Sequence, residues 1–370
     1  MRMTQKGRLV LIAAVVAVMV ALVMVFAYRE ERGSTSVVSQ RWLPDLAARL
    51  AQLDRVRLRS ATSVATLVRD GDRWIVEERS GFPADFPRLQ ALLDSLAVAR
   101  LIERKTAQPE YFERLGLSDI EQPDSEAVQV EVWAASSEPL ARVLLGNSDS
   151  TRKGRFVRGA NEQQTWLIDT APTASADPAD WIERKSLGVP FGRVALVERE
   201  FEGKPVFRAE RDTSAEGTSL TAVSLPAGKA PRYLGVFDAA ARSILTMEPE
   251  DVRRASDIDF AAAALTRIVC FDGLVIEARA LKMADGNWMT LAARADESLA
   301  RPDAAARAVS SESAAQQSPS AQSVGEEASG LEQRVAGWAF KVSDYVQGEA
   351  TKPLADYLQD DRSAAEPARK

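Results

Sequence analysis

The sequence has 370 residues, with 47 Lys and Arg against 53 Asp and Glu and a formal net charge of −6. It contains no histidine, which excludes Ser–His–Asp and Cys–His catalysis and the HExxH zinc motif but leaves carboxylate or Ser–Lys chemistry open. The single cysteine, Cys270, excludes an internal disulfide. An acidic chain also lacks the clustered basic residues that displace counterions from nucleic acid, so we expect no nucleic-acid partner.

Residues 9–28 form an uncharged, almost wholly apolar run. At about 1.5 Å per residue, a helix of this length spans about 30 Å, the thickness of a bilayer's hydrocarbon core. Residues 1–8 contain three basic residues and no acidic one, which by the positive-inside rule places them in the cytoplasm. We therefore expect a single-pass transmembrane anchor. The alternative is a cleaved signal peptide, but the run is longer than usual and does not end in small residues of the Ala-x-Ala kind.

A linker at residues 29–41 leads to a first α+β domain, expected at residues 42–170. Apolar residues recur at helical spacing in residues 42–53, and alternation around the turn Asp70-Gly71-Asp72 predicts a β-hairpin. A leucine stripe predicts a helix over residues 86–96. A short helix should follow at Tyr111–Leu115 and end at Gly116. Further strands are expected at residues 101–106, 127–134, 140–145, 155–158 and 165–168.

A second α+β domain is expected at residues 171–295. It should contain strands at residues 193–200, 205–210, 219–223, 264–270, 274–281 and 288–293, and helices at residues 236–247 and 248–254. In each domain a turn precedes a strand tryptophan, at Trp74 and Trp288. The predicted fold class is therefore α+β, with tandem mixed meander domains that could be two related halves.

Residues 296–330 are rich in Ala, Ser, Gln and Glu and almost lack large apolar residues, so we expect a disordered linker. A C-terminal helical segment at residues 331–358 and a tail at residues 359–370 should follow. Residues 331–347 have the pattern of an amphipathic helix, with apolar side chains close to one face: Leu331, Val335, Trp338, Val342 and Tyr345. This helix could dock on its own domain, bind a partner, or lie on the membrane.

No residue pattern predicts a catalytic, cofactor-binding or metal-binding site. Cys270 lies in an apolar strand and is interpreted as a core residue. Asp257 and Asp259 lack the further ligands of a calcium loop, and residues 147–150 are interpreted as a polar loop. Residues 146–154 lack the order of a phosphate-binding loop. The strand tryptophans are interpreted as core, with glycan or peptide binding as the alternative: Trp74, Trp133, Trp166, Trp181 and Trp288.

Eight short motifs follow one another along the chain: Gly71-Asp72-Arg73-Trp74, Gly81-Phe82-Pro83-Ala84-Asp85, Glu103-Arg104-Lys105-Thr106, Tyr111-Phe112-Glu113-Arg114-Leu115-Gly116-Leu117, Leu144-Leu145-Gly146, Asp251-Val252, Phe271-Asp272-Gly273-Leu274 and Gly337-Trp338-Ala339-Phe340. Taken together in this order, they resemble the domain-of-unknown-function 4340 family over about residues 42–295 plus the terminal helix. The resemblance implies a membrane-anchored bacterial protein with no assigned catalytic activity. Members are often encoded beside an ABC-type transporter that resembles the gliding-motility auxiliary system. The Ala/Ser-rich insert is longer than the family pattern.

Three functional hypotheses follow. The first is a non-enzymatic accessory or scaffold protein, anchored in the inner membrane of a Gram-negative bacterium through residues 9–28, facing the periplasm and contacting ABC-type transporter subunits. The second is a cell-envelope module that binds glycan or peptide. The third and least favoured is a hydrolase with paired carboxylates, which would need two acids about 5–10 Å apart across a pocket.

Overall fold

The computed structural model describes residues 40–211, 219–301 and 323–361. Contacts divide the chain into two compact units. The first unit contains residues up to Arg69 together with Pro87–Asp177. The second unit contains the short segment Asp70–Phe86 and everything from Pro178 onward. The boundary between the units therefore falls after residue 177 and not after the expected residue 170. The segment Asp70–Phe86, which was expected in the first domain, belongs to the second unit.

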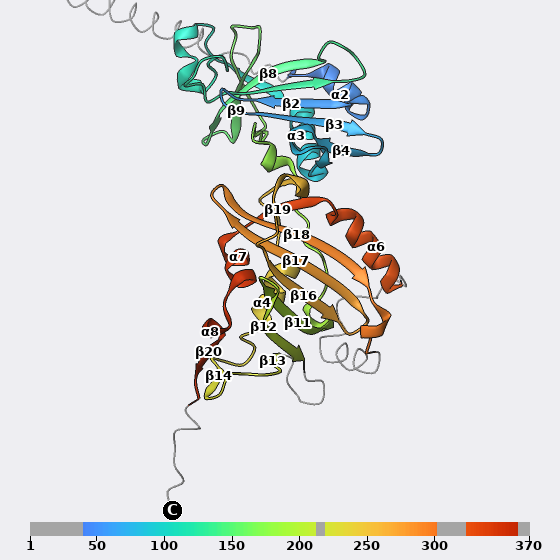
Figure 1. Ribbon diagram of the computed structural model, residues 1–370. Coiled ribbons are helices and arrows are strands. Elements are labelled where there is room, and N and C mark those ends of the chain that lie inside the picture. Colours follow the sequence, from blue (N-terminus) through green and yellow to red (C-terminus); the bar gives the residue numbers. More distant parts are fainter. Residues whose placement is uncertain (1–39, 212–218, 302–322, 362–370) are drawn as a thin grey trace, which may run out of the picture. The chain divides into compact units, whose positions relative to one another are not determined.

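The first sheet is antiparallel in every strand pairing that the structure defines, with the order β1-β6-β10-β9-β8-β7-β2-β3-β4-β5 (Figure 1). Its strands are β1 Gln40–Arg41, β2 Arg55–Arg59, β3 Val64–Asp70, β4 Arg73–Val76, β5 Phe82–Pro83, β6 Arg100–Arg104, β7 Val128–Trp133, β8 Ala141–Asp149, β9 Gly154–Gly159 and β10 Trp166–Ile168. The helices of the same region are α2 Pro44–Arg49 and α3 Phe86–Val98, with short 3-10 turns η1 Leu50–Gln52, η2 Glu77–Arg79, η3 Pro109–Tyr111 and η4 Glu113–Leu115.

Helix α3 forms where the sequence predicts it, because its leucines recur at three- and four-residue spacing. Leu89, Leu92, Leu93 and Leu96 are all buried. In β2 the period is two, and Val56 and Leu58 are buried while the residues between them are partly exposed. The hairpin around Gly71 also forms as predicted, since Gly71 has a positive φ of 60°.

The second unit is built on an eight-stranded antiparallel sheet with the order β13-β12-β11-β16-β17-β18-β19-β15. The strands are β11 Val194–Phe201, β12 Lys204–Arg211, β13 Leu220–Ala222, β15 Asp251–Arg254, β16 Ala264–Cys270, β17 Leu274–Met283, β18 Gly286–Ala295 and β19 Trp338–Val342. A separate two-stranded ribbon joins β14 Lys229–Pro231 to β20 Leu358–Asp360. The helices are α4 Asp238–Leu245, α6 Val324–Val335, α7 Asp344–Thr351 and α8 Leu354–Tyr357, and the 3-10 turns are η5 Pro178–Trp181, η6 Phe191–Arg193, η7 Ala255–Asp257 and η8 Glu297–Leu299.

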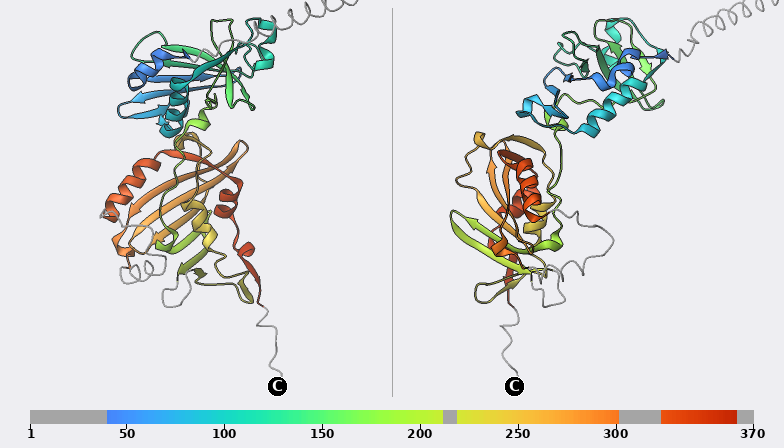
Figure 2. Two further views of the ribbon diagram at one scale, coloured as in Figure 1. Left: turned by 180° about the vertical axis from the view of Figure 1, so that it is seen from behind. Right: turned by 90° about the vertical axis from the view of Figure 1, so that its right-hand side faces the viewer.

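Helices α4 and α7 contact each other and cover one face of this second sheet, where α4 meets β11 and α7 meets β16, β17 and β18 (Figures 1 and 2). The two sheets have different strand orders. Mixed helices and antiparallel sheets confirm the α+β class at this coarse level.

The expectation of one amphipathic helix at residues 331–347 is wrong. Helix α6 ends at Val335, Gly337 takes a positive φ of 77°, and β19 then pairs with β18 on one side and β15 on the other. Leu331, Val335 and Trp338 are buried, as the pattern predicts, but they are buried by a helix followed by a strand. This segment is therefore part of the second unit itself.

The expected linker at residues 296–330 is ordered at both of its ends. Residues 297–299 form η8, and α6 begins at Val324 with a capping box between Ser323 and Glu326. Residues 302–322 lie outside the described residues.

The expected anchor at residues 9–28 also lies outside them. In the described ranges, no helix is long and apolar enough to cross a membrane.

Candidate functional site

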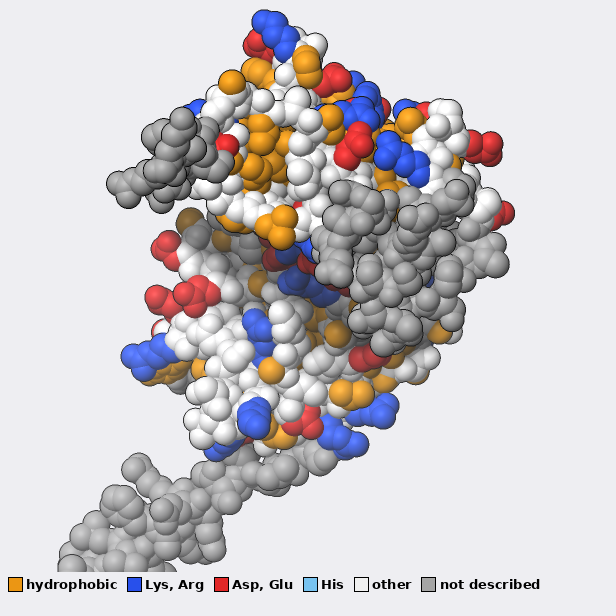
Figure 3. All heavy atoms as spheres, turned by 90° about the horizontal axis from the view of Figure 1, so that it is seen from below, with side chains coloured by type: hydrophobic (Ala, Val, Ile, Leu, Met, Phe, Trp, Pro, Cys, Tyr) orange, Lys and Arg blue, Asp and Glu red, His pale blue; other side chains and the backbone are white. Residues whose placement is uncertain are grey.

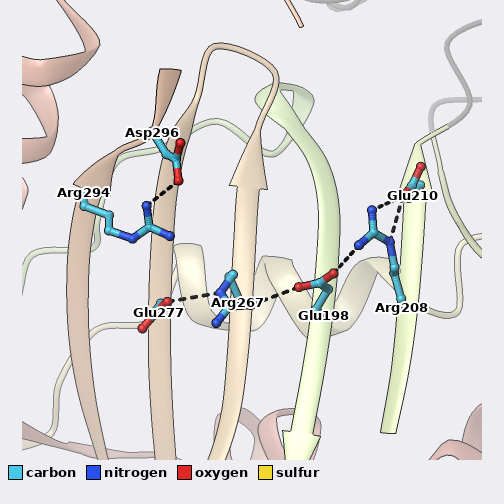
Figure 4. A network of polar contacts seen from close by, with 7 residues as sticks. All are labelled: Glu198, Arg208, Glu210, Arg267, Glu277, Arg294 and Asp296. Atoms are coloured by element: carbon cyan, nitrogen blue, oxygen red, sulfur yellow. Dashed lines mark hydrogen bonds and ion pairs between the residues drawn. The ribbon is translucent and has the colours of Figure 1, made fainter. Parts of the chain in front are cut away.

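One face of the second sheet carries a row of charges that crosses four strands. Glu198 of β11 lies opposite both Arg208 of β12 and Arg267 of β16, and Arg267 lies opposite Glu277 of β17. Residues directly opposite each other on neighbouring strands point to the same side of a sheet. The strand register therefore places these four side chains in one row (Figure 4). We call these four residues and Glu210 of β12 the charged face.

Arginine holds every carboxylate in this row. Arg267 donates to Glu198 at 3.2 Å and to Glu277 at 3.1 Å. Arg208 pairs with Glu198 and donates to Glu210 at 2.5 Å. The side chains in this row are partly exposed to solvent: 21% for Glu198, 29% for Arg267 and 27% for Glu277. A neighbouring pair, Arg294–Asp296 at 2.7 Å, continues the charges at the end of β18 (Figure 4).

The pKa values on this face favour fixed charges. The hydrogen bond that Arg267 donates to Glu277 raises the pKa of Arg267, and the one that Arg208 donates to Glu210 raises the pKa of Arg208, against an opposing effect of burial. Hydrogen bonds from Ser298 and then Arg294 lower the pKa of Asp296. These groups stay ionised across the physiological range, which suits recognition of a polar or charged surface and not proton transfer.

Two motifs of the first unit, Tyr111–Leu117 and Leu144–Gly146, meet at one packing node. Gly116, with a positive φ of 65°, ends η4. A Cβ atom on Gly116 would lie 2.6 Å from Asn147 Oδ1, and one on Gly146 would overlap the Leu115 carbonyl oxygen. The segments Tyr111–Leu117 and Leu144–Gly146 therefore touch through glycines, and their role in this structure is packing.

Arg158 completes that node from β9. It is 3% exposed and donates to the carbonyl oxygens of Leu117, Ala160 and Glu162. Its guanidinium lies 4.7 Å from the ring of Phe112. The side chain thus binds the end of the motif to the sheet with its own hydrogen bonds.

A second group of motif residues meets within the second unit. Arg79 donates to both carboxylate oxygens of Asp251, at 2.5 and 3.0 Å. The ring of Phe82 meets Trp338 edge to face at 4.9 Å, and the guanidinium of Arg254 lies 3.8 Å from that same Trp338 ring. The Gly81–Asp85 and Gly337–Phe340 motifs are therefore parts of one aromatic and ion-pair contact.

The motif Phe271–Leu274 forms the turn between β16 and β17. Asp272 accepts two hydrogen bonds from Arg193, which also binds both oxygens of Glu327 in the first turn of α6 at 2.8 Å. The hydrogen bonding of Arg193 to the Glu327 carboxylate, in which Arg193 donates, is the largest of the effects that raise the pKa of Arg193. Arg193 joins three segments that are distant in the sequence, and no local pattern marks it.

Cys270 lies fully buried at the end of β16. Burial raises the pKa of its thiol to about 12, and the nearby guanidinium of Arg193 opposes this shift only in part. A thiol that stays protonated at neutral pH is a poor nucleophile. The structure thus places this cysteine in the core.

The other polar candidates lie in turns or at the end of a strand, and residues 147–149 form strand where a polar loop was expected. Asp259 Oδ1 accepts from the Ala261 amide at 2.9 Å, and Asp257 is the last residue of η7. Residues 147–149 belong to β8, and Asp149 Oδ1 accepts from the amides of Thr151 and Arg152. In the parts of the chain that the structure describes, no group of three or more His, Cys, Asp or Glu residues is placed to hold a metal ion.

A comparison with curated proteins and with solved structures finds no match. A family model does match, over residues 74–259, which is half of the chain. Its description is a domain of unknown function, DUF4340. The matched range includes Phe82, the glycine node of the first unit and Asp251, and on these grounds the chain belongs to the DUF4340 family.

Proposed function

We propose that this chain is a non-enzymatic accessory or scaffold subunit that acts by protein–protein contact. Residues 9–28 hold it in the bacterial inner membrane, residues 1–8 stay in the cytoplasm, and the two units face the periplasm. The partner is a subunit of an ABC-type transporter complex. The charged face of the second unit is the observation that supports the proposal.

The charged face suits protein contact for a physical reason. Its arginines and glutamates are held in place by one another before any partner arrives, so little side-chain entropy remains to be lost on binding. Arginine is enriched at protein interfaces, and complementary charge gives an interface its specificity and its rate of association. Figure 3 shows a surface on which Lys and Arg side chains are interspersed with Asp and Glu, without a broad region of one sign.

The face is also poorly suited to two other roles. A basic surface would attract nucleic acid or anionic lipid, but here each arginine is matched by an acid. Hydrolysis by paired carboxylates needs two acids that face each other across a pocket, but Arg267 lies between Glu198 and Glu277 in the sheet and donates a hydrogen bond to each.

Co-purification tests the proposal directly. The full chain with an affinity tag is expressed in its own bacterium, extracted in mild detergent and isolated, and the proteins that come with it are identified by mass spectrometry. We expect ABC-type transporter subunits. Replacing two exposed arginines, Arg208→Glu in the charged face together with Arg294→Glu beside it, should lower the recovery of the transporter subunits by about tenfold, because reversing a close charge pair costs about 1.5 kcal/mol or more.

The matched control is Lys282→Glu, which reverses a charge at an exposed position of β17 outside the charged face. It should leave the recovery unchanged. The far-ultraviolet circular dichroism of both variants must match that of the wild type, so that unfolding is not the cause of a loss. If no transporter subunit accompanies the wild-type chain, the proposal fails.

The second hypothesis, glycan or peptide binding through strand tryptophans, has weaker support. Trp181 and Trp288 are 0% and 1% exposed, and Trp74 and Trp133 are 8% and 7% exposed. These four buried indole rings offer no stacking surface to a ligand, and of the five tryptophans named for this role only Trp166 of β10 is partly exposed. A binding screen for this role must use a chain that includes residues 323–361, because β19 lies inside the second sheet.

A further inference from the structure

The interior strand β2 of the first sheet has two unlike sides. Val56 and Leu58 are fully buried on one side, whereas Arg55, Arg57 and Arg59 lie on the other side and are exposed or partly exposed. Alternate residues of a strand point to the same side and lie about 6.8 Å apart. The three arginines therefore form a row about 14 Å long on one side of the sheet.

A buried carboxylate on the next strand holds two arginines of this side in place. Glu131 of β7 lies opposite both Arg57 of β2 and Arg142 of β8. Its side chain is 1% exposed, and its Oε2 accepts from Arg57 Nε at 2.7 Å while its Oε1 pairs with Arg142 Nε at 2.6 Å. The side chains of Arg57 and Arg142 are 37% and 40% exposed. Glu131 thus fixes two guanidinium groups side by side at the surface.

Trp133 holds the same side of the sheet from β7. It lies opposite Arg55 and is 7% exposed. The guanidinium carbons of Arg55 and Arg57 lie 5.7 and 5.1 Å from its ring. Contacts of a cation with an aromatic ring restrict long side chains before any partner binds, so that less side-chain entropy is lost on binding.

From this placement we propose that Arg55, Arg57, Arg59 and Arg142, which we call the arginine face, bind a short extended segment of a partner polypeptide with Asp or Glu at every second position. Guanidinium groups bind carboxylates with two parallel hydrogen bonds. In an extended peptide, side chains on one side repeat at about 6.8 Å, which is also the spacing of the arginines along β2.

A short segment fits this face better than a long polyanion or an anionic membrane does. The face covers about 14 Å along β2 and about 10 Å from β2 to β8. A nucleic acid, a sulfated glycan or a lipid surface would extend beyond it, towards a chain whose formal net charge is −6. An acidic segment of about five residues spans the row without leaving the face.

The arginine face does not depend on the proposed transporter contact. It belongs to the first unit, whereas the charged face belongs to the second unit. Peptide binding is measured on the purified chain and needs no transporter subunit. A failure of either proposal is therefore distinguishable from a failure of the other.

Two synthetic peptides test the spacing. The full chain, purified in mild detergent, is titrated into a fluorescein-labelled octapeptide of four Glu-Ser repeats, and fluorescence anisotropy reports binding. The comparison peptide has the same composition but carries its four glutamates in one block, so that only two of them share a side when it is extended. At low salt the alternating peptide should bind about fivefold more tightly. Equal affinities would overturn the proposal.

A pair of double variants tests the position of the site. Arg55→Gln with Arg59→Gln should weaken binding of the alternating peptide by about fivefold, because two charge contacts are lost. The matched control is Arg69→Gln with Arg104→Gln. Both are exposed arginines of the same sheet, but the strand register places them on the side of Val56. The control should bind as the wild type does, and an equal loss in both double variants would contradict the arginine face.

Competition tests the choice of partner. A heparin fragment and mixed micelles that contain phosphatidylglycerol are added to the bound alternating peptide at matched concentrations of negative charge. Neither should displace it more effectively than an excess of unlabelled peptide. More effective displacement by heparin would assign the face to a long polyanion, and more effective displacement by the micelles would assign it to a lipid surface. Either result would overturn the proposal.

Discussion

Gly146 lies directly against the carbonyl oxygen of Leu115, so that no side-chain atom fits between the two backbones. Gly146 comes from β8, and Leu115 is the last residue of η4. The close approach joins two segments that the family resemblance marks separately. A glycine is therefore needed at position 146 for the two segments to pack.

Gly146→Ala should lower the free energy of unfolding by about 1–3 kcal/mol, because the added methyl group must push the Leu115 backbone away. Urea denaturation followed by circular dichroism measures it. Gly330→Ala is the control, since Gly330 is an exposed position inside α6 with open space around it. That change should raise the stability by up to about 1 kcal/mol, the ordinary gain of alanine in a helix. Equal effects of the two changes would contradict the packing argument.

Arg79 and Asp251 should be energetically coupled. Their bidentate contact joins residues 172 positions apart, and each side chain is only 22% exposed. A double-mutant cycle with Arg79→Ala and Asp251→Ala should give a coupling energy of about 0.5–3 kcal/mol. The same cycle on Lys229 and Asp360, which are 45% and 88% exposed, should give almost none. A weaker coupling for Arg79–Asp251 than for the exposed pair would show that the contact has no structural role.

Arg267→Gln should destabilise the second unit by about 1 kcal/mol or less, because it removes the cation between Glu198 and Glu277 on a partly exposed surface. Glu198 and Glu277, which lie on either side of β16, then repel each other without a cation between them, and salt screens that repulsion. The difference from the wild type should therefore shrink as sodium chloride is raised from low concentration to about 0.5 M. A salt-independent difference would point to packing of the arginine stem instead.

Cys270 should make the second unit less stable at alkaline pH. Burial raises its pKa to about 12 in the folded chain, from the ordinary thiol value of 9.0. The unfolded thiol therefore loses its proton first, and the stabilising effect of the buried thiol is complete below about pH 9 and is lost as the pH rises towards 12. The stability difference between the wild type and Cys270→Ala should fall over this range. A difference that stays constant, or rapid labelling of the native thiol at pH 8, would contradict the assignment to the core.

A chain that ends at residue 322 should lose cooperative unfolding of the second unit. It lacks β19, which pairs with β18 and β15, and it lacks Glu327, which binds Arg193. A chain that ends at Asp361 keeps every described contact and should unfold as the full chain does. Thermal melts of the two truncations make the comparison. A native melt of the shorter chain would mean that β15 holds its place without β19.

The sequence predicts those parts of the fold that depend on local periodicity. Helix α3 and the hairpin around Gly71 form from neighbouring residues. Burial repeats every three to four residues in α3 and every second residue in β4, whereas residues 65–67 of β3 are all buried. The core position of Cys270 also follows from its apolar neighbours. The capping box of Ser323 and Glu326 is also a local sequence signal. It predicts that α6 begins at Val324, before the expected start at residue 331.

The remaining features depend on register and on distant partners. Leu331, Val335 and Trp338 fit one helical face, but Gly337 interrupts the helix, and the strand that follows is stabilised by β18 and β15. The charged face joins Glu198 to Arg267 across 69 positions, and a shift of one residue in either strand would send one of them to the opposite face. Single-sequence periodicity carries no information on such a register.

The position of β19 also constrains the order in which the second unit can mature. On the ribosome, β15 is made before residue 255 and β18 before residue 296, but the strand that joins them emerges only at residues 338–342. Until then both strands keep open edges, which are prone to pair with other chains. The sheet of the second unit is therefore completed only after β19 has been synthesised. A chaperone that binds exposed strand edges would act mainly before that point.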